Sequence, residues 1–156
     1  MYECLCYDFF HSQRNQEIIW YVSTQPTPSR IGECRFASRR GTVVVVYGQS
    51  VHADRALALA SQLAVRRGSE LVVLIDADAQ SFQALEAAAR AQLEAVKAEA
   101  KFETMGPGEL TALKAALKRH RGGLLVMASD CRLIEGRQDQ LSSLDIPVLL
   151  ARNTAR

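Results

Sequence analysis

Polar residues that could support chemistry lie mainly in short segments that directly follow apolar runs of the sequence. Gly48–Ser50 follows the first such run, Asp76 and Asp78 follow the second, and Ser129–Cys131 follows a later one. The turn Gly48–Ser50 has backbone N–H groups for an anion, but a tight connection into a helix is the commoner role and the one that we favour. For the two aspartates, a metal site or a phospho-acceptor pocket competes with capping of a helix near Ser81, which we favour.

Two further residues, His52 and Cys131, have side chains that could take part in catalysis. His52 forms no recognisable pair with a nucleophile, and Asp54 is the one nearby acid that could orient it, so we interpret it as a surface histidine. Cys131 lies near an expected helix start, where a thiol is acidified, but the adjacent Asp130 works against acidification. Because no general base is paired with a nucleophile, the sequence predicts that the protein is not an enzyme.

The cysteines do not form a metal-binding or redox motif. None of them makes a C-x-x-C pair, and no histidine spacing completes a zinc site. We therefore expect reduced thiols, with a redox or metal role as the alternative, and neither a metal nor a cofactor is predicted. The four residues are Cys4, Cys6, Cys34 and Cys131.

Length and composition favour a globular domain in the cytoplasm. The 156 residues are 48% hydrophobic and 23% charged, which excludes disorder over the whole chain. The 19 basic and 17 acidic residues give a net charge of +2, too balanced to indicate a nucleic-acid partner. No apolar run reaches the roughly 18–20 residues that span a bilayer, and the N-terminus lacks the layout of a signal peptide. We accordingly expect no association with a membrane.

From Gly41 onward, apolar runs alternate with amphipathic segments. Five runs, of which the third is the weakest, predict strands at 42–47, 71–75, 101–105, 124–128 and 146–151. Helical spacing predicts helices that begin near Ala53, Phe82 and Leu110, and a short polar stretch up to Leu144 is also expected to be helical. In the second helix, the apolar stripe consists of Phe82, Leu85, Ala89, Leu93 and Val96. The alternation predicts an α/β fold with an open, parallel, five-stranded sheet and helices on both faces.

Residues 1–40 differ in composition from the domain at 41–156 and are interpreted as an N-terminal arm. They hold seven of the ten aromatic residues and three of the four cysteines. The run 17–22 is a possible short strand. We expect the aromatic side chains to pack on the domain or on a partner subunit. The alternative is that translation starts later and the arm is poorly ordered.

The ends of the predicted strands mark a candidate ligand cleft. In open parallel sheets, ligands bind beyond the carboxyl ends of the strands, where the direction of winding reverses. The carboxyl ends of three predicted strands carry polar or small residues that could line such a cleft. These are Tyr47, Gly48, Gln49, Ser50, Asp76, Ala128, Ser129 and Asp130.

The order of these segments resembles the universal stress protein family over about residues 41–152. The resemblance rests on four segments, which are Val43–Ser50, Arg67–Leu71, Leu124–Ser129 and Ile146–Leu150. It implies a small cytoplasmic stress or regulatory protein that usually dimerises. One branch of the family binds ATP or AMP and another does not.

The nucleotide-binding loop of that family is missing from this sequence. Its aspartate at the end of strand one falls on Tyr47, and its three glycines fall on Ala128, Cys131 and Leu141. Of that motif only the hydroxyl remains, as Ser142, which joins the candidate cleft. Glycines let backbone N–H groups approach phosphates, and Asp130 adds a repulsive charge where triphosphate would lie.

We therefore expect a non-catalytic stress-response or regulatory module that acts through dimerisation and partner contacts, without ATP binding. The alternative is a switch that binds AMP or ATP weakly in a remodelled cleft. Missing glycines favour the first interpretation.

The last predicted strand also predicts a homodimer. Its residues Val148, Leu149, Leu150 and Ala151 carry no charge and come last in the winding, so we expect them at a sheet edge. Antiparallel pairing with a twofold copy would satisfy the unpaired backbone groups, and the family resemblance points the same way. The alternative is that residues 18–22 cover this edge within one chain and leave a monomer.

Overall fold

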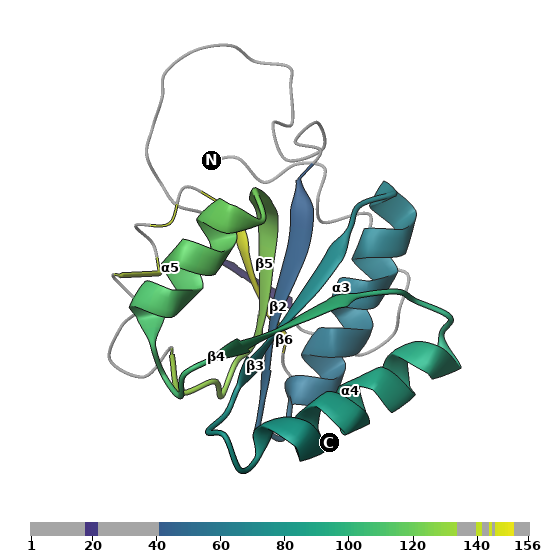
Figure 1. The fold of residues 1–156 in the computed structure, drawn as a ribbon. Helices are drawn as coiled ribbons and strands as arrows, with labels where there is room; N and C mark the ends of the chain where they lie inside the picture. The colour runs from purple at the N-terminus through teal and green to yellow at the C-terminus, as the bar shows by residue number, and fades with distance from the viewer. Residues whose placement is uncertain (1–17, 22–40, 134–139, 142–143, 145, 152–156) are drawn as a thin grey trace.

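The computed structural model describes residues 18–21, 41–133, 140–141, 144 and 146–151 (Figure 1). Six strands and three helices lie in these segments. The strands are β1 (Ile18–Tyr21), β2 (Thr42–Gly48), β3 (Leu71–Asp76), β4 (Lys101–Met105), β5 (Gly122–Ala128) and β6 (Val148–Ala151). The helices are α3 (Ala53–Arg67), α4 (Phe82–Ala95) and α5 (Leu110–Arg119).

The strands form one sheet in the order β1-β6-β5-β2-β3-β4. Strands β2 to β6 are parallel to one another, which confirms the predicted five-stranded parallel sheet. Strand β1 adds a sixth, antiparallel member, and its four residues pair with the four residues of β6. The expectation that β6 lies at the sheet edge is therefore wrong, because β1 occupies that position. The opposite edge of the sheet is β4.

The central strands are buried because helices cover both faces of the sheet. Nine residues of β2 and β3 are at most 3% exposed, namely Val43–Val46 and Leu71–Ile75. Figure 1 shows α3 and α4 on one side of the strands and α5 on the other. Right-handed crossovers explain this arrangement, because the chain winds from β2 toward β4 and then reverses across β2 to reach β5.

The helix boundaries follow local sequence signals. Helix α3 covers the predicted range and ends at Gly68, whose left-handed φ of 60° is the conformation that glycine adopts most readily at a helix C-terminus. In α4, Ala89 and Leu93 are buried as predicted, but Val96 is 55% exposed and lies just beyond the last helical turn. The predicted stripe is thus one residue too long.

Four other expectations differ from the structure or lie outside it. Strand β5 begins at Gly122 rather than at 124, and β6 begins at Val148 rather than at 146. The aromatic residues of the arm and most of the expected helical stretch before Leu144 lie outside the residues whose side chains are described. No described helix combines the length and the hydropathy that a membrane span requires.

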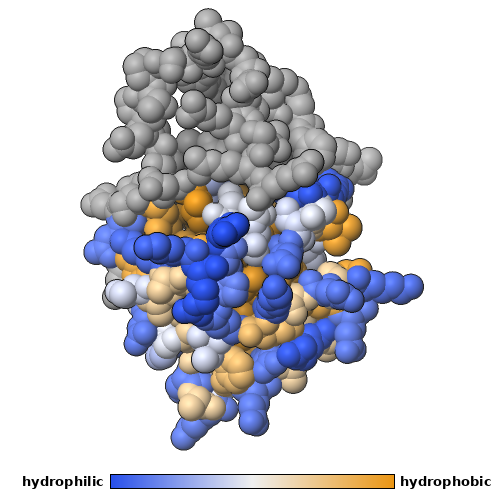
Figure 2. All heavy atoms as spheres, turned by 45° about the horizontal axis from the view of Figure 1, so that its top comes forward, coloured by the Kyte–Doolittle hydropathy of each residue, from blue (hydrophilic) through white to orange (hydrophobic). Residues whose placement is uncertain are grey.

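The surface of the described part of the chain carries few large hydrophobic side chains. Figure 2 shows hydrophilic side chains over much of the described surface on this side, with smaller hydrophobic areas between them. Among the described residues, the exposed large hydrophobic side chains are Val51, Val65 and Val96. Scattered single side chains of this kind are normal and do not mark an interface.

The amino ends of β2 and β5 approach so closely that they require glycine. The register between the two strands shifts at this point, since Thr42 pairs with Gly122 and Val43 pairs with Leu124. Gly123 is therefore an extra residue of β5, as in a β-bulge. A Cβ atom built on Gly123 would lie 2.8 Å from the Cα atom of Gly41, and one built on Gly41 would lie 2.6 Å from the Cα atom of Gly123.

We expect Gly123→Ala to lower the free energy of unfolding by about 1–3 kcal/mol, because the new methyl group meets backbone that cannot move aside. The matched control is Gly106→Ala, whose Cβ would contact the exposed Glu109 side chain at 2.7 Å. That side chain can rotate away, so the control should cost less. Urea denaturation of both variants measures the difference, and equal losses would contradict the close-approach argument.

Candidate functional site

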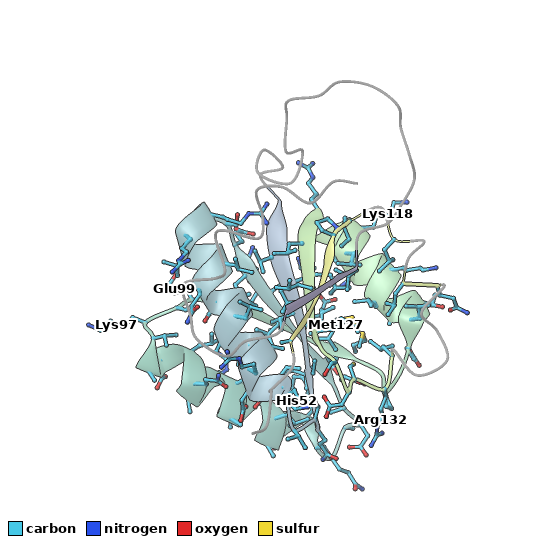
Figure 3. The ribbon with its side chains drawn as sticks, turned by 180° about the vertical axis from the view of Figure 1, so that it is seen from behind. His52, Lys97, Glu99, Lys118, Met127 and Arg132 are labelled. Carbon is cyan, nitrogen blue, oxygen red and sulfur yellow. The ribbon has the colours of Figure 1, made fainter. Side chains whose placement is uncertain are left out.

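A cleft of about 170 Å³ lies at the carboxyl ends of β2, β3 and β5. This is the point where the direction of winding reverses between β2 and β5. His52 and Arg132 lie at this end of the sheet in Figure 3, whereas Lys118 lies toward the other end. The lining residues are Val46, Gly48, Gln49, Ser50, Asp76, Ala77, Asp78, Ser81, Pro107, Ala128, Asp130, Cys131 and Arg132.

The structure brings together most of the candidate residues and excludes others. Two of them do not line this cleft. The Tyr47 side chain is 4% exposed and its hydroxyl donates to Asp54 of α3, while the Ser129 N–H donates to the carbonyl of Ala151. Ser142 lies outside the described residues. The candidates that do line the cleft are Gly48, Gln49, Ser50, Asp76, Ala128 and Asp130.

Several lining residues were not among the predicted cleft residues. The segment that follows β5 supplies Cys131 and Arg132, and the turn before α4 supplies Ser81, whereas Ala77 and Asp78 belong to the segment 76–78 that was expected at a strand end. Their position directly after strand ends was a usable signal, because every such loop opens at the same edge of a parallel sheet. Pro107 comes from the loop after β4, at a strand end that the prediction did not use.

Asp130 is tied to the turn between β2 and α3. One carboxylate oxygen accepts a hydrogen bond from the Ser50 hydroxyl, and the other accepts from the Val51 N–H at 3.2 Å. The Ser50 oxygen in turn accepts from the His52 N–H at 3.2 Å. A carboxylate from the β5 side thus satisfies donors that lie directly ahead of the N-terminus of α3.

The other two aspartates of the cleft also accept backbone hydrogen bonds. Asp76 accepts from the Gly108 N–H at 2.9 Å, which joins the end of β3 to the loop between β4 and α5. Asp78 accepts from the Ser81 N–H at 2.8 Å, and this bond lowers the pKa of the Asp78 carboxyl. Asp78 thus supports the expected turn before α4, whereas Asp76 bonds to the loop between β4 and α5 instead.

Burial keeps two weakly acidic groups protonated near the cleft. Burial, together with the hydrogen bond to Asp54, raises the pKa of the Tyr47 hydroxyl well above its usual value. Burial raises the pKa of the Cys131 thiol from 9.0 to about 11, and the charges of Asp76 and Asp130 act in the same direction. Since the thiolate is the reactive form of cysteine, this shift works against a reactive Cys131 at neutral pH.

Hydrogen bonds fix the orientation of the Ser50 hydroxyl. It donates to Asp130, and its oxygen accepts from the His52 backbone N–H, so the Ser50 proton is bonded to a carboxylate rather than to an imidazole. Within the described segments, no group of three or more histidine, cysteine, aspartate or glutamate side chains is arranged to hold a metal ion. The arrangement is suited to binding a small molecule.

Comparison with known proteins supports the fold. No protein-family model and no curated protein matches the chain. A universal stress protein from Archaeoglobus fulgidus superposes with a TM-score of 0.56 at 15% identity, over 72% of this chain and 98% of its own. Another structure from that organism, in complex with dAMP, gives 0.56 at 18% identity, over 72% of this chain and 97% of its own.

A third structure, a universal stress protein in complex with cAMP, gives a TM-score of 0.58 at 18% identity. It is matched over 73% of this chain and 99% of its own length. These likenesses confirm that the domain has the fold of universal stress proteins.

The protonated state of Cys131 predicts a specific loss of stability in alkali. The unfolded thiol ionises above its ordinary pKa of 9.0, whereas the folded thiol ionises near 11. The contribution of this group is complete below about pH 9 and declines by on the order of 2 kcal/mol as the pH rises to about 11.

Cys131→Ala removes this titration. The stability difference between the wild-type protein and the variant should therefore shrink across the interval from about pH 9 to about pH 11. Urea unfolding under reducing conditions at each pH measures it. The other three cysteines are the same in both proteins, so a difference that stays constant with pH would contradict the assignment.

Proposed function

We propose that this chain is a non-catalytic regulatory module of universal stress protein type that acts in the cytoplasm through a protein partner and does not bind ATP. The observation that carries the proposal is the position of Asp130. Its carboxylate binds the turn that precedes α3, which is where a nucleotide phosphate would find backbone donors.

The turn ahead of α3 is suited to an anion, and Asp130 already supplies one. A helix N-terminus and the N–H groups just before it favour negative charge. In this chain the Val51 N–H and the Ser50 hydroxyl donate to the same carboxylate. A phosphate that entered would have to displace Asp130 from these donors or remain without them.

The charge of the cleft also opposes a phosphate. Among the described lining residues, the three carboxylates of Asp76, Asp78 and Asp130 face one cationic side chain, that of Arg132. Two like charges about 4 Å apart repel by about 1 kcal/mol in water and by about 4 kcal/mol at a surface-like effective dielectric constant. The several charges of ATP multiply this cost.

The size of the cleft favours a ligand smaller than a nucleotide. Its volume of about 170 Å³ is below the roughly 300–1,000 Å³ of pockets that enclose drug-sized ligands. The proposed regulatory role therefore does not depend on a bound nucleotide. A role for nucleic acid is also disfavoured, since Glu103 forms an ion pair with Arg119 and a hydrogen bond with the His120 ring at the basic end of α5.

A weak adenine-nucleotide switch is the second candidate. Two observations support it, since the cleft lies at the carboxyl ends of the strands and two structural neighbours were solved with cAMP and dAMP. Each of those ligands carries a single phosphate, which meets less repulsion than three do. Under this alternative the cleft should bind AMP more tightly than ATP, and it should bind adenosine at least as tightly as AMP.

We expect ATP to bind the wild-type protein no more tightly than the millimolar range, which corresponds to roughly −4 kcal/mol. Asp130→Asn removes the charge nearest the turn donors and should tighten ATP binding by roughly tenfold. Isothermal titration at low ionic strength measures both values, with AMP and adenosine as further ligands.

The matched control for this experiment is Glu99→Gln. It removes one negative charge at an exposed position that does not line the cleft and lies away from Arg132 in Figure 3. Equal effects of the two substitutions would show that only net charge matters. Low-micromolar ATP binding to the wild-type protein would overturn the proposal, and low-micromolar AMP binding would establish the alternative.

A further inference from the structure

The two strands beside β6 run in opposite directions to each other. Its four residues pair in parallel with Leu125–Ala128 of β5, and the same four residues pair antiparallel with β1. We propose that the outer edge of β6 is a strand-binding site which β1 closes within its own chain, so that β1 excludes a second copy of the protein from this edge. This inference is independent of the cleft and its ligand.

Without β1, the edge of β6 would be open to other strands. All four of its side chains are at most 5% exposed, and none of them is charged. Pro147 lies before the strand, so all four residues of β6 keep a backbone N–H group that can donate. A neutral edge with free N–H and C=O groups is a template for pairing, and a short added strand is one way in which proteins protect such an edge.

The direction of β1 shows which partner strand this edge accepts. β1 pairs antiparallel in continuous register, from Ile18 with Ala151 to Tyr21 with Val148. When two copies of a strand pair about a twofold axis perpendicular to the sheet, they are also antiparallel. β6 of a second copy would therefore use the same backbone groups that β1 uses, and the two strands compete for one site.

The comparison structures indicate that β1 is an addition to the shared fold. The Archaeoglobus fulgidus protein is covered over 98% of its length by 72% of this chain. That share corresponds in size to the segment from Gly41 to the end of β6. We infer from this agreement in size that β1, at residues 18–21, lies outside the common domain.

Covalent attachment favours closure by β1 over closure by a second copy. A strand in the same chain meets its site at an effective concentration on the order of millimolar. At a protein concentration of about ten micromolar, β6 of a second copy would need an intrinsic affinity about a hundredfold higher than that of β1 to occupy the edge equally often. We therefore expect the intact chain to be monomeric and to dimerise when β1 is prevented from pairing.

A disulfide trap tests which strand occupies the site in the full-length protein. Directly opposed Cα atoms in antiparallel strands are about 4.5–5.5 Å apart, within the range that a disulfide spans. Ile19→Cys with Leu150→Cys places cysteines at paired positions. The native cysteines at 4, 6 and 34 are replaced by serine in this background.

We expect this pair to oxidise within one chain, as seen by non-reducing electrophoresis and peptide mapping. The control is Trp20→Cys with Leu150→Cys, which is out of register by one residue and places the two side chains on opposite faces. The control should remain reduced. A bond between two chains, or no bond at the paired positions, would overturn closure by β1.

The second measurement breaks β1 without shortening the chain. Ile19→Pro with Tyr21→Pro removes two backbone donors from β1, and the conservative control is Ile19→Val with Tyr21→Phe. Light scattering should give a mass near 17.2 kDa for the wild-type and control proteins and twice that mass for the proline variant. A wild-type dimer, or a folded proline variant that remains a monomer, would contradict the competition. If the proline variant does not fold, the disulfide trap decides the question.

Discussion

The parallel pairing of β2 with β5 is the contact on which the rest of the domain depends. It joins the half of the sheet that winds toward β4 to the half that ends in β6. At the amino ends of the two strands, Gly41 and Gly123 allow the backbones to approach. At the carboxyl ends, the reversal of winding opens the cleft, and Asp130 bridges from the β5 side to the turn after β2. Close packing at one end and the cleft at the other thus follow from a single strand pair.

The sequence predicted the parallel sheet well because strand interiors are determined by local side-chain type. Runs such as Val43–Val46 carry β-branched residues that are suited to burial on both faces. Strand ends were harder to place. Gly122 and Gly123 carry no side-chain signal, and their strand conformation depends on the facing residues of β2. The pairing of β1 with β6 was the alternative to the predicted homodimer, since local sequence does not specify which distant edge a four-residue strand will meet.

Sheet topology predicted where the cleft lies, but it did not predict which side chains of a strand point into the cleft. The strand ends gave six of the residues that line the cleft. Tyr47 was placed there wrongly because neighbouring residues on a strand point to opposite faces, so that Val46 lines the cleft while Tyr47 turns to Asp54. The bond between Ser50 and Asp130 joins residues 80 positions apart, and sequence spacing does not reveal such a contact.

The pairing of the first described strand with the last has a consequence for how the chain matures. During synthesis, β1 leaves the ribosome before the sheet exists, and its partner β6 is made last. The β1–β6 pair cannot form before β6 has been made, and it is a long-range contact of the kind that forms slowly. In that interval, a newly completed β6 is uncovered. The choice between pairing with β1 and pairing with a second copy then depends on how fast β1 pairs with β6 as well as on affinity.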